Sequence, residues 1–155
     1  MRKLLIFIGI VAFLFGYTNN VSLAQQDFIT MDNGLRYLDF ATGSGAIAET
    51  GMIVVVHLIG WLDDNGAKGS KIISTYDRGK PVSFKLGTDR VMKAWSEGVR
   101  GMKTGGKRRL LVPSKLGYGE KEVGGIVPPN ADLVFDVELL EISDHQQSWG
   151  YEDGP

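Results

Sequence analysis

The sequence of 155 residues contains no cysteine. This absence excludes disulfide bonds, thiolate chemistry, cysteine-ligated zinc and a lipid carried on an N-terminal cysteine. The two histidines, His57 and His145, lie far apart and outside any carboxylate cluster, so we expect no metal site. No serine stands in a suggestive order with a histidine and a carboxylate, so the sequence does not support hydrolysis by a catalytic triad.

An excess of charge of one sign is also lacking. The 17 Lys and Arg against 18 Asp and Glu give a formal net charge of −1, which does not indicate nucleic-acid binding. The segment Gly101–Arg108 nearly matches a phosphate-binding loop, but Arg108 stands where the magnesium-binding Ser or Thr is needed. A helix is predicted before this segment and a strand after it, which reverses the order of such a loop. We therefore expect no nucleotide and no cofactor.

A long hydrophobic run is the third absence. The apolar stretch Leu4–Phe15 is shorter than the roughly 20 residues that span a bilayer. Arg2 and Lys3 precede it, and the small residues of Ser22-Leu23-Ala24 follow it, which is typical of a signal peptide and its cleavage site. We predict a signal peptide at 1–24, no stable membrane span after cleavage, and export to the periplasm or cell envelope. The alternative is an uncleaved membrane anchor.

Hydrophobic alternation and turn residues predict a single domain at 33–142, between a polar lead-in at 25–32 and a mobile polar tail at 143–155. The predicted strands are Leu35–Ala41, Met52–Leu62, Ile72–Tyr76, Val82–Leu86, Lys107–Val112 and a last strand from Leu133 to Leu139. The segment Asp63–Lys71 is predicted to be a loop or hairpin tip. With one helix, five or six antiparallel strands indicate an α+β domain.

The helix is predicted to be short. Thr88 or Asp89 would cap it, and Gly98 and Gly101 would weaken and end it. Its apolar residues recur at helical spacing: Val91, Met92, Trp95 and Val99. Trp95 would face the sheet, where it forms either ordinary core or the floor of a pocket, and both interpretations stay open.

Two further sets of polar residues are expected to be structural. His57 lies inside an apolar strand, which predicts a buried, hydrogen-bonded histidine. Lys103, Lys107, Arg108 and Arg109 form a basic cluster that we expect to be a solvated face. On a strand, Lys107 and Arg109 share a solvent face, while Arg108 faces the other way. Weak contact of this cluster with an anionic lipid or a partner remains an alternative.

Five motifs follow one another in order: Val55-Val56-His57, Tyr76–Pro81, Trp95–Met102, Gly117-Tyr118-Gly119 and Gly125–Leu140. In these motifs the chain resembles the FKBP-type peptidyl-prolyl cis-trans isomerases, from about Gly51 to Ile142. The resemblance implies a curved antiparallel sheet of five to six strands wrapped around one short helix. It also implies an isomerase that accelerates the rotation of X-Pro bonds in folding polypeptides, by non-covalent binding in an apolar pocket.

The resemblance also implies site residues. Trp95 would be the pocket floor, Tyr118 would hold a substrate carbonyl through its hydroxyl, and Phe135 would be the last-strand aromatic; we assign these three as catalytic. The residues that would bind the substrate are Leu58, Ile72, Ile73, Val82, Val91, Met92 and Ile126. The implied partners are proline-containing polypeptides, and the protein is expected to be a monomer.

Four of these positions differ from the family pattern. Leu58, Ile72 and Val82 are aliphatic where the family often has an aromatic ring, and Ile73 replaces a carboxylate. An aliphatic wall stays apolar but loses ring faces that pack on proline. This predicts weakened affinity for macrolide immunosuppressants. It also leaves an alternative function, a catalytically weak proline-peptide-binding or chaperone module on the same fold.

Overall fold

The structure, a computed structural model, describes residues 27–143. The predicted signal peptide at 1–24 and the polar tail from residue 144 onward lie outside these residues. Within them, no helix is long and apolar enough to cross a membrane.

Seven strands of the described chain form one antiparallel sheet in the order β1-β2-β6-β7-β3-β4, and β5 pairs with a further part of β3. The strands are β1 (Ile29–Thr30), β2 (Arg36–Ala41), β3 (Ile53–Asp64), β4 (Ala67–Ser74), β5 (Val82–Lys85), β6 (Lys107–Val112) and β7 (Leu133–Ser143). The α-helix α1 spans Lys93–Val99, and a short 3-10 helix, η2, spans Ser114–Leu116.

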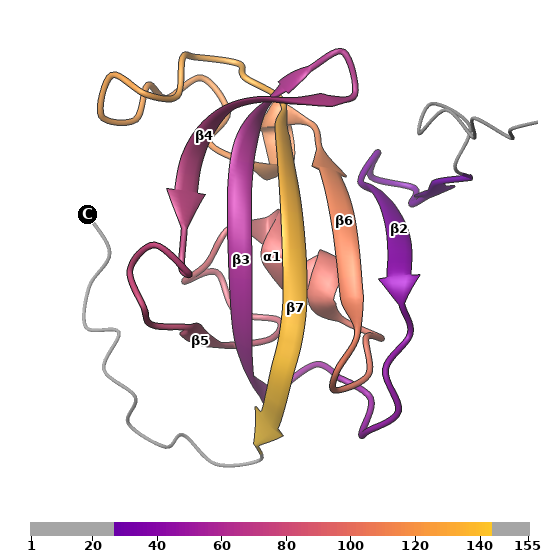
Figure 1. The fold of residues 1–155 in the computed structure, drawn as a ribbon. Coiled ribbons are helices and arrows are strands. Elements are labelled where there is room, and N and C mark those ends of the chain that lie inside the picture. The colour runs from indigo at the N-terminus through magenta and orange to yellow at the C-terminus, as the bar shows by residue number, and fades with distance from the viewer. Residues whose placement is uncertain (1–26, 144–155) are drawn as a thin grey trace, which may run out of the picture.

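The sheet curves around α1, which lies against one face of it behind β3 and β7 (Figure 1). This confirms the predicted fold. β3 and β7 are the two longest strands and pair with each other along their length. Because side chains alternate between the faces of a strand, Val54, Val56 and Leu58 of β3 all point to the helix side and are buried. The two-residue strand β1 lies in the predicted lead-in and adds to the edge at β2.

The predicted hairpin tip at Asp63–Lys71, with its turn at Asp64-Asn65-Gly66, is confirmed, and the alternative of a loop over the whole segment is wrong. β3 runs to Asp64 and β4 begins at Ala67, so only Asn65 and Gly66 connect them. Both residues have positive φ, 54° and 87°, as a two-residue hairpin turn with the right twist requires. Strand pairing therefore continues almost to the tip.

The predicted helix cap is also wrong. α1 begins at Lys93 after Met92, without a side-chain capping bond, and the Thr88 hydroxyl instead donates to the Lys85 carbonyl. The helix is short, as predicted. Gly98 lies inside it for a packing reason, because a Cβ there would be 2.5 Å from Cδ1 of Leu110 on β6.

His57 faces the opposite side of β3 from the helix and is only half-buried, so the prediction of a buried histidine is wrong in that respect. Its predicted hydrogen bond is present, between Nδ1 and the Thr75 hydroxyl at 2.8 Å. Its ring also stacks on Tyr76, with 4.2 Å between centroids.

Candidate functional site

Two aromatic rings meet where the helix faces the centre of the sheet. Phe135 of β7 is fully buried, and the half-buried indole of Trp95 on α1 meets it edge-to-face, with 5.6 Å between centroids and 90° between planes. Perpendicular contacts of this kind are favourable because the ring edge is positive and the ring face negative. The ring of Phe84 on β5 also lies near the indole, with 6.1 Å between centroids and 36° between planes. The orientation of Trp95 is therefore defined by rings from two different strands.

Gly60 on β3 makes room for Phe135. A Cβ at this position would lie 2.4 Å from Cε1 of Phe135 and 2.8 Å from Cγ2 of Ile73. Gly60 pairs with both residues across the two neighbouring strands. Sequence reasoning missed Gly60, although an isolated glycine inside a strand often marks a close approach of another group.

The aromatic pair belongs to the single apolar core of the domain, and further half-buried apolar side chains pack against that core. All predicted site residues except Ile126 belong to, or pack against, one apolar cluster. Phe135 and Leu58 are buried within it, whereas Trp95, Tyr118, Ile72, Ile73, Val82, Val91 and Met92 are partly exposed at its surface. Ile126 stands apart, on the loop before β7, with 55% of its surface exposed. The structure thus brings nearly all of these residues together and leaves Ile126 outside.

The segment that carries Tyr118 is fixed by its own backbone. After η2, Gly119 donates to the Ser114 carbonyl at 2.8 Å and accepts from Asn130 at 2.7 Å. Gly119 and Asn130 both have positive φ, 61° and 59°. Tyr118 therefore packs against the cluster from a well-defined turn.

Polar groups at this site are few. The indole N–H of Trp95 is covered and has no hydrogen-bond partner. No three His, Cys, Asp or Glu side chains within residues 27–143 are grouped so that they could hold a metal ion. What the arrangement offers is an apolar surface with one indole and one phenol, which suits non-covalent binding of an apolar ring.

Two groups with shifted pKa values, Tyr76 and Asp136, lie instead on the opposite face of the sheet. Burial, together with a hydrogen bond to Glu138, raises the pKa of Tyr76 to about 12. Burial alone would raise the pKa of Asp136, but hydrogen bonds from Arg109 and Lys68 outweigh it and lower that pKa. Both groups are engaged in structural pairs on the outer face.

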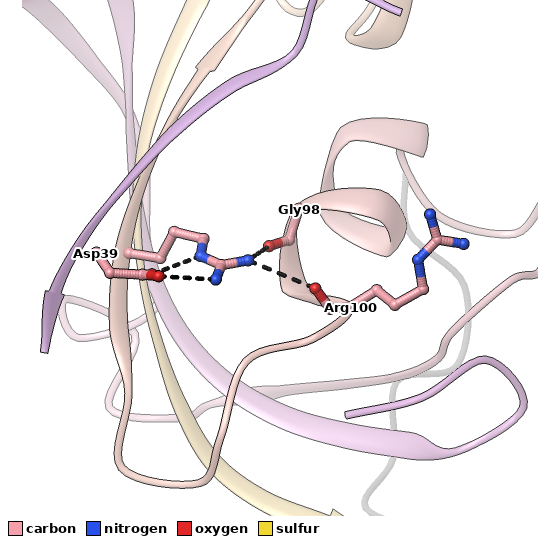
Figure 2. Close-up of polar contacts among 4 residues, drawn as sticks. Asp39, Gly98 and Arg100 are labelled. Atoms are coloured by element: carbon pink, nitrogen blue, oxygen red, sulfur yellow. Dashed lines mark hydrogen bonds and ion pairs between the residues drawn. The ribbon is translucent and has the colours of Figure 1, made fainter. Parts of the chain in front are cut away.

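The predicted orientation of Arg108, away from the solvent face of Lys107 and Arg109, is confirmed, because its side chain is buried on the helix side of β6. The expectation that the basic cluster is a solvated face is therefore wrong for Arg108 alone, and sequence reasoning missed what its side chain binds. It donates to both Asp39 oxygens at 2.6 and 2.9 Å and to the carbonyls of Gly98 and Arg100 at 2.9 and 3.4 Å, as Figure 2 shows. Because side chains alternate along a strand, Arg108 faces the same side as the core residues Leu110 and Val112, and the sequence alone indicates this.

Comparison with known proteins agrees with this geometry. The model of the family described as FKBP-type peptidyl-prolyl cis-trans isomerase matches residues 45–140. An FK506-binding protein of Neisseria meningitidis serogroup B is 45% identical over 109 residues, covering 70% of this chain and 96% of that protein. The peptidyl-prolyl cis-trans isomerase FPR2 of Saccharomyces cerevisiae is 50% identical over 95 residues, 61% of this chain and 68% of that one.

Two solved structures are similar as well. AtFKBP13 superposes with a TM-score of 0.67 at 34% identity, over 76% of this chain and 99% of that chain. FkpA from Escherichia coli superposes with a TM-score of 0.65 at 40% identity, over 74% of this chain and 51% of that chain. By its sequence, its sheet wrapped around one short helix and these similarities, the chain belongs to the FKBP-type peptidyl-prolyl cis-trans isomerase family.

Proposed function

We propose that this protein accelerates rotation about X-Pro bonds in folding polypeptides. The observation that carries the proposal is the contact of the half-buried Trp95 indole with the buried Phe135 ring, in an apolar core whose surface includes further partly exposed apolar side chains, in a chain of this family. The prolyl ring would lie against the indole, inside the ring of aliphatic side chains.

The physical basis is the electronic structure of the amide. Resonance gives the X-Pro bond partial double-bond character and a rotational barrier of roughly 18–20 kcal/mol. Twisting the bond reduces the charge separation of the planar amide. An apolar surface favours the less polar twisted state over the planar one. A thousandfold gain requires only about 4 kcal/mol, and it needs neither a covalent step nor a proton transfer.

The side chains would divide this work between them. Trp95 supplies a flat apolar surface, and Phe135 supports it from below. Tyr118 would donate its hydroxyl to a substrate carbonyl and so fix which side of the bond rotates. Val91 and Met92, which precede α1, would border the prolyl ring. Ile126 would contact the peptide from its exposed loop.

A protease-free isomerisation assay on the purified full chain tests the proposal, using proline peptides with several residue types before the proline. We expect clear acceleration, a large loss of kcat/KM in Trp95→Ala and a smaller loss in Tyr118→Phe. If the wild-type chain accelerates none of the peptides, the proposed activity is wrong. If it does accelerate them and both variants match it, the site assignment is wrong.

A second candidate function is a proline-peptide-binding or chaperone module with little catalysis. The aliphatic residues Leu58, Ile72 and Val82 favour it, because fewer ring faces are available to stack on a proline. Ile73 favours it as well, because it replaces a carboxylate of the family pattern. Measurable peptide affinity in a chain that gives no acceleration would support this module. The same residues predict weaker FK506 binding than in aromatic-lined relatives, which calorimetric titration of the full chain would measure.

We also propose that the protein is exported, to the periplasm or cell envelope. The proposal rests on the basic start, short apolar run and small residues at 1–24. N-terminal sequencing of the product from a fractionated bacterial host tests it. A mature chain that begins at Gln25 supports export with cleavage, and an intact chain in the cytosolic fraction contradicts it.

A further inference from the structure

The C-terminal end of helix α1 is held from outside the helix. The last carbonyls of any helix lack partners within it. Here Gly98 and Arg100 each present a carbonyl oxygen to one guanidinium nitrogen, Nη1 of Arg108, at 2.9 and 3.4 Å (Figure 2). A cation at this end also suits the negative pole of the helix dipole. One side chain of β6 therefore ties down the end of α1.

Arg108 is itself held in place on its other side. Its Nε and Nη2 atoms donate to the two carboxylate oxygens of Asp39 on β2 at 2.6 and 2.9 Å, and its guanidinium lies over the Tyr37 ring at 4.1 Å. Only 8% of the Arg108 side chain is exposed. A buried guanidinium that moved would leave several polar groups unpaired, which is costly. Arg108 is thus a rigid link between β2, β6 and α1.

This link is close to Trp95. Gly98 follows Trp95 by less than one helical turn, about 4.5 Å along the axis. The Gly98 backbone also packs directly on Leu110, which follows Arg108 by two residues on the same face of β6. At the other end of α1, Met92 provides no side-chain cap. Between the two ends, the Ser96 hydroxyl accepts from the Gly87 N–H at 2.7 Å and Glu97 accepts from Asn33. The C-terminal fastening is therefore one of the contacts that set the position of the indole over Phe135.

We propose that Arg108 is a positioning residue for Trp95. By fixing the end of α1 against β2 and β6, it keeps the indole in its perpendicular contact with Phe135 and so keeps the apolar surface for the prolyl ring intact. The catalytic part of this inference rests on the proposed function. The geometric part, that the Trp95 orientation depends on Arg108, can be measured without turnover.

The next residue along the chain provides a matched control. Arg109 points to the opposite face of β6, where it pairs with both Asp136 oxygens at 2.7 and 2.9 Å and lies over the Phe40 ring at 4.8 Å. Each of the two arginines thus forms two hydrogen bonds to one carboxylate and lies over one aromatic ring. They differ in that Arg108 also bonds to the helix.

The experiment compares Arg108→Lys with Arg109→Lys in the full chain. Lysine keeps the charge but cannot hold a carboxylate and two carbonyls at once, because it lacks the planar fork. In an NMR spectrum the Trp95 indole N–H signal is assigned by its loss in Trp95→Phe. We expect Arg108→Lys to shift this signal and to lower kcat/KM about tenfold, in line with the sensitivity of rates to small misplacements. Arg109→Lys should leave the signal in place and kcat/KM within about twofold.

Asp39→Asn provides a second test in case Arg108→Lys does not fold. It weakens the hold on the guanidinium but leaves the bonds to the helix, so we expect a smaller shift of the indole signal in the same direction. A wild-type indole signal in a folded Arg108→Lys or in Asp39→Asn, or an equal shift in Arg109→Lys, overturns the proposal. A wild-type chain without turnover refutes the proposed activity, while the indole comparison still decides whether Arg108 positions Trp95.

Discussion

Two consecutive arginines on β6 show how the faces of the sheet differ. Arg108 and Arg109 each form a forked pair with an aspartate and each lie over an aromatic ring. Arg108 is enclosed between the sheet and the helix. Arg109 lies on the outer face, where its partner Asp136 also pairs with Lys68. An arginine in the same kind of ion pair therefore connects the helix to the sheet on one face, whereas on the other face it connects two neighbouring strands.

The apolar residues follow the same division. The inner face of β3 and β7 carries Phe135, Leu58 and Val56, all buried. The outer face carries polar pairs, such as Lys107 of β6 with Glu138 of β7, and Tyr76 of the turn after β4 with the same Glu138. A substitution should consequently have an effect that depends more on the face it alters than on its residue type.

The largest effect is expected for Phe135→Ala. Removing a fully buried phenyl ring costs about 3–5 kcal/mol of unfolding free energy, and it leaves Trp95 without its support. The outward-facing Tyr76→Ala, at a residue that is 47% exposed, should cost about 1 kcal/mol. Urea denaturation of both variants measures the contrast, and equal losses would contradict the division between the faces.

Arg108→Ala should come next. Breaking a buried ion pair costs about 3–5 kcal/mol, and we expect the lower value because Asp39 is partly solvated. Arg109→Ala removes an arginine that is more exposed, 18% against 8%, and that has no bond to the helix, so it should cost less, about 1 kcal/mol. Thermal and urea unfolding provide the measurement. If Arg109→Ala proved the more damaging variant, the inner pair would not be the structural link described above.

Gly60→Ala probes the inner face at a single atom. The added methyl would overlap Phe135 and Ile73, so we expect a loss of about 1–3 kcal/mol together with a lower kcat/KM. In the double variant Gly60→Ala/Phe135→Leu the shorter side chain relieves the overlap, so the combined cost should be less than the sum of the two single costs. Strict additivity in urea denaturation would show that the two positions do not press on each other.

The smallest effect is expected for Asp136→Asn, on the outer face. The folded-state pKa of Asp136 is lowered by Arg109 and Lys68 against the opposing effect of burial. The ionised carboxylate therefore stabilises the fold above the unfolded pKa of about 3.9, and this contribution disappears as pH falls through the lower folded pKa. We expect wild type to lose more stability than Asp136→Asn between pH 6 and pH 3 in urea titrations. Parallel curves would mean that the pair contributes nothing.

The sequence could predict the fold because each main element has its own pattern of apolar residues. The alternation from Leu133 to Leu139, the apolar run of β3 and the helical spacing of Trp95 and Val99 each reflect one element alone. The errors concern interactions between elements. The two-residue turn at Asn65-Gly66 has positive φ at both positions, and it allows pairing to continue into a segment whose polarity is typical of a loop.

The candidate site shows the same limit. The family resemblance predicted the aromatic and the aliphatic site residues, and in the structure all of them except Ile126 belong to, or pack against, one apolar cluster. Gly60 and Arg108 were missed because their roles depend on Phe135 and on the end of α1, which are distant in sequence. The available signal for Arg108 was a charged residue at a strand position that faces the same side as the core residues Leu110 and Val112. The signal for Gly60 was a glycine inside an otherwise apolar strand.

The place of β7 in the sheet has a consequence for biosynthesis. This strand is made after every other strand of the described chain, yet it lies between β3 and β6. Until about residue 143 has left the ribosome, neither neighbour can complete its pairing and the indole has no phenyl ring beneath it. Such non-local closure is slow compared with local folding. A nascent chain of this protein should therefore remain open, and accessible to chaperones and proteases, until β7 has been synthesised.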